Sequence, residues 1–124
     1  MKGVYVVFAF LERDKDIEIG ALGTIEFEKG VYAYVGSGQN SLEKRLKRHF
    51  APTEDKHWHI DYFTSEARVF DFFAVPEGPN YECTLAQHLS NRSKPVERFG
   101  SSDCSCASHL FKLPESFSQS KTRF

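Results

Sequence analysis

The sequence predicts an α+β domain in which helices flank a central, mostly antiparallel sheet. Residues 4–11, 31–35 and 67–75 are rich in β-branched and aromatic side chains, which is typical of buried strands. Residues 41–50 instead place apolar side chains at helical spacing. The predicted order is strand, long hairpin, strand, basic helix, short element, strand and helix, and this mixture is typical of the α+β class.

The composition indicates an ordinary globular domain. With 124 residues, of which 40% are hydrophobic and 27% charged, the chain fits one domain; we expect it to span residues 1–113, followed by a polar tail over 114–124. The net charge is −1, so binding to nucleic acid would require a local basic patch. The mean hydropathy is −0.45, and no apolar run approaches the ~20 residues that span a bilayer, so no membrane association is expected.

The cysteines predict a reducing compartment. There are three of them, an odd number, and Cys104 and Cys106 are too close in sequence for an ordinary disulfide bridge. The N-terminus lacks the small-residue cleavage site of a signal peptide. We therefore expect a cytoplasmic protein.

The first half of the chain predicts a long hairpin between two strands. Residues 12–16 form a charged turn, and 17–20 and 23–27 are short strand candidates separated by glycines. The strand at 31–35 is expected to end at the Gly-Ser-Gly segment over 36–38.

A basic amphipathic helix is expected over residues 41–50. Asn40 has the position of an N-cap, and Glu43 follows three residues later, as in a capping box. One face of this helix is apolar, and the other face consists of Lys44, Arg45, Lys47 and Arg48.

The second half of the chain predicts three more elements. Residues 57–63 indicate a short helix, and 67–75 indicate a third core strand. Asn80 is expected to cap a helix that runs to about Leu89. Glu82 lies in the first turn of that helix, where the helix dipole favours a carboxylate.

Short elements along the chain resemble those of the GIY-YIG nuclease superfamily. Gly3-Val4-Tyr5 is similar to the GIY element, and Tyr34-Val35-Gly36 is similar to the YIG element. Arg45 and His49 follow one turn apart on the next helix, as in that family. Glu82 opens a later helix, where the family keeps its metal-binding carboxylate.

Residues 6–33 lie between the GIY-like and the YIG-like element, and this separation is much longer than is usual in the family. We therefore expect an elongated or additional hairpin that still lets the two strands pair. The stretches YAYVGSG, RLKRH, HWHIDY, ECTLAQHL and FGSSDCSCASHLF resemble, more closely, a small branch of the superfamily that also occurs fused to base-excision glycosylases of the endonuclease III type. That resemblance implies DNA repair, with a repair protein as a partner.

The chemistry of a phosphodiesterase can be assigned to five residues. Arg45 provides a fixed cation whose fork fits phosphate oxygens, and Glu82 provides a hard oxygen ligand for Mg²⁺ or Mn²⁺. The resemblance implies that Tyr5 or Tyr34 acts as the general base, and His49 faces the same way as Arg45 and can assist. Because a free tyrosine has a pKa near ~10, that role requires a strongly perturbed site.

Further residues are expected to bind the substrate. A glycine after the strand lets a phosphate approach the backbone and the N-terminus of the next helix, and basic side chains neutralise phosphates. The expected substrate-binding residues are Gly36, Ser37, Lys44, Arg48, His57 and His59.

Each of these residues also has a purely structural interpretation. Tyr5 and Tyr34 are equally typical of a strand in a core, and the basic residues of a solvated helix face. Glu82 is also typical of a first helical turn, and His49 of a packing or capping residue. The two histidines that flank Trp58 are also typical of its packing partners.

Three functions remain open at this point. The first is a divalent-metal-dependent endonuclease that hydrolyses phosphodiester bonds in DNA. The second is a non-catalytic nucleic-acid-binding module, in which the basic helix holds phosphates and an aromatic such as Trp58 stacks on bases. The third is a zinc-stabilised interaction domain that uses Cys104, Cys106 and His109, although this spacing is not a usual zinc motif.

Overall fold

The computed structural model describes residues 2–39, 41–51, 55–56, 58–100 and 108–114. Its elements are β1 (Gly3–Leu11), β2 (Lys15–Glu18), the 3₁₀ turn η1 (Gly20–Leu22), β3 (Thr24–Phe27), β4 (Gly30–Gly38), α1 (Leu42–Phe50), α2 (His59–Thr64), β5 (Arg68–Val75), α3 (Asn80–Ser90), β6 (Lys94–Pro95) and β7 (Leu110–Lys112). Several residues discussed above lie outside the described residues, namely Asn40, His57, Cys104, Cys106 and the tail over 115–124.

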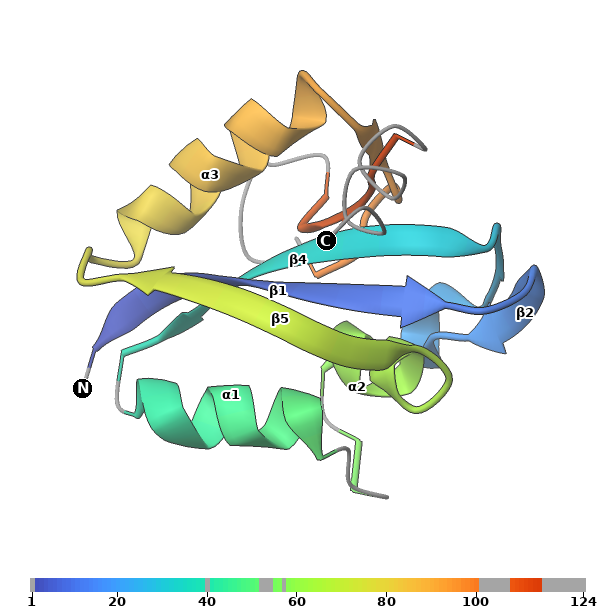
Figure 1. Cartoon of the computed structure of the whole chain (residues 1–124), viewed down its shortest axis with the longest axis horizontal. Coiled ribbons are helices and arrows are strands. Elements are labelled where there is room, and N and C mark those ends of the chain that lie inside the picture. The colour runs from blue at the N-terminus through green and yellow to red at the C-terminus, as the bar shows by residue number, and fades with distance from the viewer. Residues whose placement is uncertain (1, 40, 52–54, 57, 101–107, 115–124) are drawn as a thin grey trace.

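The central layer is a five-stranded antiparallel sheet with the order β5-β1-β4-β7-β6 (Figure 1). β1 and β4 pair along their full lengths, with Tyr5 opposite Gly36. The β2–β3 hairpin forms a separate two-stranded sheet in the chain between them. The α+β class is therefore confirmed, and the intervening residues form the additional hairpin while β1 and β4 still pair.

Helices cover both faces of the central sheet. α1 and α2 lie on one face and α3 lies on the other (Figure 1). Successive residues of β1 alternate between these faces, so Tyr5 and Val7 join the cluster that contains Ile60 and Phe63 of α2. Val4 and Val6 join the opposite cluster, against α3.

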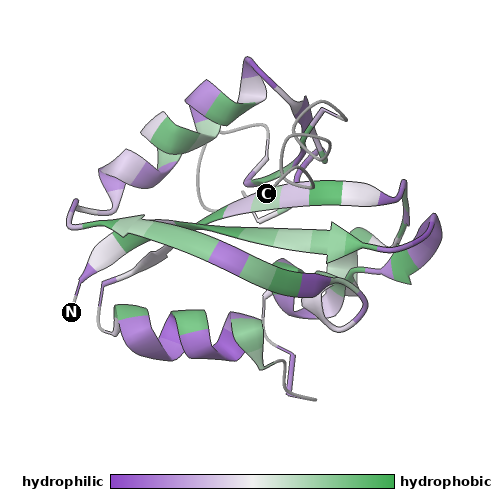
Figure 2. Cartoon of the chain, in the orientation of Figure 1, coloured by the Kyte–Doolittle hydropathy of each residue, from purple (hydrophilic) through white to green (hydrophobic). Residues whose placement is uncertain are grey.

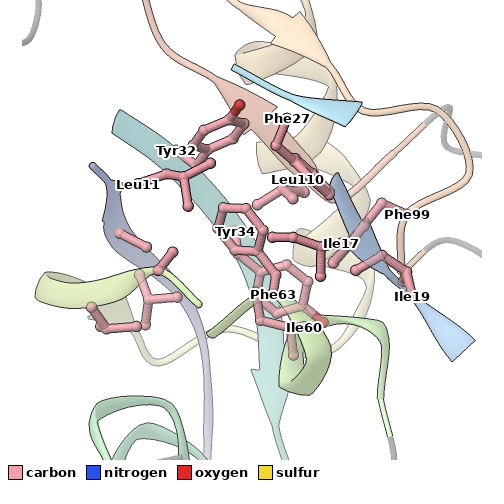
Figure 3. Close-up of a cluster of buried hydrophobic side chains, with 14 of the residues drawn as sticks. Leu11, Ile17, Ile19, Phe27, Tyr32, Tyr34, Ile60, Phe63, Phe99 and Leu110 are labelled. Atoms are coloured by element: carbon pink, nitrogen blue, oxygen red, sulfur yellow. The ribbon is translucent and has the colours of Figure 1, made fainter. Parts of the chain in front are cut away.

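An aromatic cluster fixes the hairpin and α2 against the sheet. Phe63 is fully buried, and its ring centroid lies 4.9 Å from that of Phe27 and 5.0 Å from that of Tyr32. Figure 3 shows Phe63 and Tyr34 in this cluster, together with side chains from the hairpin. Tyr34 is thus held rigidly at the point where β4 passes α2.

The expectation that residues 67–75 form a core strand is wrong. β5 is a strand, but it lies at the edge of the sheet and pairs only with β1 among the described strands. The side chains of Phe72 and Phe73 are 45% and 44% exposed. An apolar run indicates a strand, but it does not indicate how many neighbours the strand will have.

The end of β4 also differs from the prediction. The strand does not stop at residue 35 but continues through the Gly-Ser-Gly segment to Gly38, because Gly3 to Tyr5 of β1 pair with this segment. Pairing partners far away in sequence have overridden the turn preference of glycine.

Both predicted helix caps are wrong by one residue. Ser41 is the N-cap of α1, and its hydroxyl accepts a hydrogen bond from the Lys44 backbone N–H. Pro79 precedes α3, and Asn80 is already its first helical residue. α1 turns its apolar side to the sheet and its hydrophilic side outward (Figure 2). None of the helices in the described part of the chain is long and apolar enough to cross a membrane.

Candidate active site

A buried hydrogen bond between Tyr5 and His49 forms the centre of the candidate site. The Tyr5 hydroxyl lies 2.7 Å from His49 Nε2, and the two side chains are 0% and 1% exposed. Tyr5 belongs to β1, and His49 lies in the last turn of α1. The contact therefore joins the sheet to the helix that packs on it.

Two glycines of β4 make this arrangement sterically possible. A Cβ atom at Gly36 would lie 2.3 Å from the Tyr5 hydroxyl oxygen, so any side chain there would displace the tyrosine. A Cβ atom at Gly38 would lie 2.7 Å from Leu42 Cα, so this glycine lets α1 begin directly against the strand. The Gly-Ser-Gly segment thus allows both the Tyr5 side chain and the start of α1 to pack closely against β4.

Arg45 brings a positive charge to the Tyr5–His49 pair. It lies one turn before His49 on α1, and its guanidinium carbon lies 4.0 Å from the centre of the Trp58 ring. Burial raises the pKa of Tyr5 to about 12, and the charge and hydrogen bonding of Arg45 oppose that rise. Arg45 Nε is buried and has no hydrogen-bond partner among the described residues, so its hydrogen-bonding capacity is unsatisfied.

Tyr34 lies beside the same histidine and is also buried. Its ring centroid is 5.8 Å from that of His49, in an edge-to-face arrangement. Burial, followed by the neighbouring Tyr5, raises the pKa of Tyr34 well above its ordinary value. Tyr34 therefore stays protonated and supports the histidine by packing.

The proton positions differ from those that a tyrosinate base would require. The surroundings raise the pKa of Tyr5, whereas that role needs a lowered one. His49 shows the opposite shift: burial first, then the charge of Arg45, lowers its pKa to about 4. At neutral pH the pair consists of a neutral phenol and a neutral imidazole, in which His49 can accept the tyrosine proton.

Glu82 approaches from the other side of the sheet. It belongs to the first turn of α3, its side chain is 22% exposed, and its Oε1 lies 2.8 Å from Nδ1 of the buried His109. Its negative charge contributes, after burial, to the raised pKa of both Tyr5 and Tyr34. The structure thus gathers the four predicted catalytic residues, Tyr5, Tyr34, Arg45 and His49, on the α1 face. The charge of Glu82, the predicted metal ligand, reaches both tyrosines.

The donor set suits a hydrated divalent ion. The described residues contain no group of three or more histidine, cysteine or acidic side chains that could enclose a metal. Mg²⁺ usually keeps several waters and takes only one or two carboxylates together with substrate phosphate. Glu82 is partly exposed and supplies one such carboxylate, so the residues present fit this mode of binding.

The predicted substrate-binding residues fall into two groups. Ser37 and Lys44 line a pocket at the start of α1, together with Arg45. His59 and Arg48 are instead engaged within the protein: His59 Nδ1 accepts a hydrogen bond of 2.9 Å from the Gly100 backbone N–H. Burial lowers the pKa of His59. His57 lies outside the described residues.

Asp61 was not among the residues predicted for the site. Its two carboxylate oxygens lie 3.1 and 3.0 Å from Nε and an Nη of Arg48, and one also accepts a hydrogen bond of 3.0 Å from the Trp58 backbone N–H. The bond to Asp61 raises the pKa of Arg48. A carboxylate three residues after a helix N-cap is the signal that could have identified the bond of Asp61 to the Trp58 backbone N–H.

The burial of neutral His49 predicts a loss of stability in acid. Its pKa is about 4 in the folded protein and about 6.5 when unfolded, so the unfolded state binds more protons below pH 6.5. We expect the folded state to lose about 2–3 kcal/mol between pH 7.5 and pH 4.5 through this group. Urea unfolding at both pH values measures it. The loss should be absent in His49→Gln and retained in His88→Gln, which changes an exposed histidine.

Comparison with known proteins gives one match. A family model described as a domain of unknown function, DUF123, matches residues 4–123. No curated protein and no solved structure matches the chain. Since the model covers almost all of the sequence, the chain belongs to the DUF123 family.

Proposed function

We propose that this protein is a GIY-YIG-type endonuclease that hydrolyses phosphodiester bonds in DNA with the help of Mg²⁺ or Mn²⁺. DNA repair, in company with a repair protein, is the role that its sequence resemblance favours. The observation that supports the proposal best is the buried hydrogen bond of 2.7 Å between Tyr5 and His49, with Arg45 beside it. All three residues belong to the elements that resemble the superfamily.

The Tyr5–His49 pair provides a route for the proton of the attacking water. A water molecule that donates a hydrogen bond to the Tyr5 oxygen can transfer its proton there as it attacks phosphorus. Tyr5 at the same time passes its own proton to His49 Nε2, so no free tyrosinate has to form. Because the pKa of Tyr5 is raised, its proton would leave only as the proton of the attacking water arrives.

A bound substrate would also make His49 a better base. The charge of Arg45 is the second cause of the low pKa of His49, after burial. A phosphodiester paired with Arg45 would offset that positive charge and raise the histidine pKa. The base would therefore become stronger when substrate is present.

The remaining groups act on the phosphoryl oxygens and the leaving group. Arg45 neutralises charge on the phosphoryl oxygens as the new bond forms and the bond to the leaving oxygen breaks. The leaving oxygen takes a proton from solvent water, and His49 returns its own proton to solvent when the product leaves. Glu82 is the residue that would hold the divalent ion, which supplies charge neutralisation and lowers the pKa of water when bound. Arg45 belongs to α1 and Glu82 to α3, which lie on opposite faces of the sheet (Figure 1).

A cleavage assay tests the proposed function. The protein is incubated with supercoiled plasmid, branched DNA, single-stranded DNA and RNA, each in Mg²⁺, Mn²⁺ or EDTA. We expect metal-dependent products from at least one DNA substrate. Binding without any product would instead favour the non-catalytic binding module. The raised pKa values of Tyr5 and Tyr34 also fit that alternative, because neither tyrosine readily loses its proton.

A further inference from the structure

A pocket at the start of α1 lies directly beside the candidate active site. Its volume is about 470 Å³, within the range of small-ligand pockets, and it is lined among others by Ser37, Lys44, Arg45 and Trp58. Arg45 belongs both to this pocket and to the surroundings of Tyr5. A ligand in the Trp58 pocket would therefore be adjacent to a phosphate held at the active site.

The charge of the Trp58 pocket favours an anion. Among the described residues that line it, Lys44 and Arg45 are cationic and none is acidic. The first turn of α1 adds the positive end of a helix dipole. A second pocket of about 410 Å³ is lined by Glu12 and Glu66 as well as by basic residues, so it does not share this character.

Trp58 presents a fixed aromatic surface in this pocket. The residue is 38% exposed, although tryptophan is usually well buried. Its backbone N–H is bound by Asp61, which in turn is held by Arg48, and the guanidinium groups of Arg45 and Arg48 lie 4.0 and 5.0 Å from the ring centre. The indole is thus oriented before any ligand arrives, which lowers the entropy lost on binding.

From this arrangement we propose that the Trp58 pocket binds an unpaired nucleotide of single-stranded nucleic acid, with the base stacked on the exposed part of Trp58 that the two guanidinium groups leave uncovered, and a flanking phosphate held by Lys44 and Arg45. A base in a duplex has both faces covered by its neighbours, so only an unpaired or extruded base can stack on the protein. The inference rests on the proposed function for the identity of the substrate. It narrows that substrate to strands with unpaired nucleotides beside the cleaved bond.

Trp58 is the only tryptophan in the chain, so its fluorescence reports the contact directly. The wild type is titrated in EDTA with a single-stranded oligonucleotide, DNA or RNA, and with a blunt duplex of the same length. We expect quenching and tighter binding with the single strand. Because EDTA prevents metal-dependent cleavage, the result does not depend on whether the protein is a nuclease.

Two variants test the stacking by anisotropy of a labelled strand. Trp58→Ala should weaken single-strand binding about 5- to 100-fold, while Trp58→Phe should retain part of it. Phe73→Ala is the matched control, because Phe73 is similarly exposed, at 44%, on the sheet face opposite α1. Equal binding of single strand and duplex, absence of quenching in the wild type, or unchanged binding by Trp58→Ala would each overturn the proposal.

Discussion

Replacing Tyr5 with phenylalanine is expected to lower the cleavage rate about 10²- to 10⁴-fold, the usual contribution of a positioned proton-transfer group. The substitution removes only the hydroxyl that lies 2.7 Å from His49 Nε2 and leaves the buried ring in place. It interrupts the proton route while preserving the packing between β1 and α1. Single-turnover cleavage with saturating Mg²⁺ measures the effect.

Tyr32→Phe is the matched control for this substitution. Tyr32 is also buried on the α1 face of the sheet, and its hydroxyl donates a hydrogen bond of 2.6 Å to the Glu28 carbonyl. We expect it to lose about 1 kcal/mol of stability and to keep its cleavage rate. If Tyr5→Phe cleaves as fast as Tyr32→Phe, the Tyr5–His49 relay is wrong.

Gly36→Ala is expected to damage both the fold and the site. The new Cβ atom would lie 2.3 Å from the Tyr5 hydroxyl oxygen and 2.4 Å from Cζ, and the Tyr5 ring that it would displace is fully buried. We expect a loss of about 1–3 kcal/mol from overpacking, and a cleavage rate as low as that of Tyr5→Phe, because the hydrogen bond to His49 is displaced. Urea unfolding and cleavage are measured on the same preparation.

Gly78→Ala supplies the comparison for the glycine variant. A Cβ atom at Gly78 would meet nothing within 4 Å, and its backbone conformation is one that alanine adopts readily. This variant should be as stable as the wild type or slightly more stable, because alanine restricts the unfolded chain. If both glycine variants unfold at the same urea concentration, the close approach at Gly36 does not constrain the site.

The sequence was a good guide to elements whose side chains follow a clear period. The run at 4–11 and the apolar face of 41–50 predicted β1 and α1 almost to the residue, because hydrophobic periodicity reflects burial directly. The edge position of β5 was not predictable in this way, since it depends on which strands are neighbours. The extension of β4 to Gly38 likewise depends on pairing with β1, some thirty residues earlier in the chain.

The site was predicted in composition but not in geometry. Spacing placed Arg45 and His49 on one helix face, and the structure adds the contact to Tyr5, which is 44 residues away in sequence. Spacing could not indicate that Glu82 would approach from the opposite face and pair with His109. Nor could it indicate that burial would raise the pKa of Tyr5 and lower that of His49, because both shifts arise from tertiary packing.

We propose that this fold hydrolyses DNA with a divalent ion held by Glu82, and the most direct test compares cleavage by the wild type, Glu82→Gln and Glu77→Gln over a range of Mg²⁺ concentrations. Glutamine keeps the size of the side chain and removes its charge, and Glu77 is an exposed glutamate just before the same helix. We predict metal-dependent cleavage by the wild type and Glu77→Gln, and none by a folded Glu82→Gln. Equal cleavage by all three proteins, or cleavage that persists in EDTA, would contradict the proposed role of Glu82 as the metal ligand.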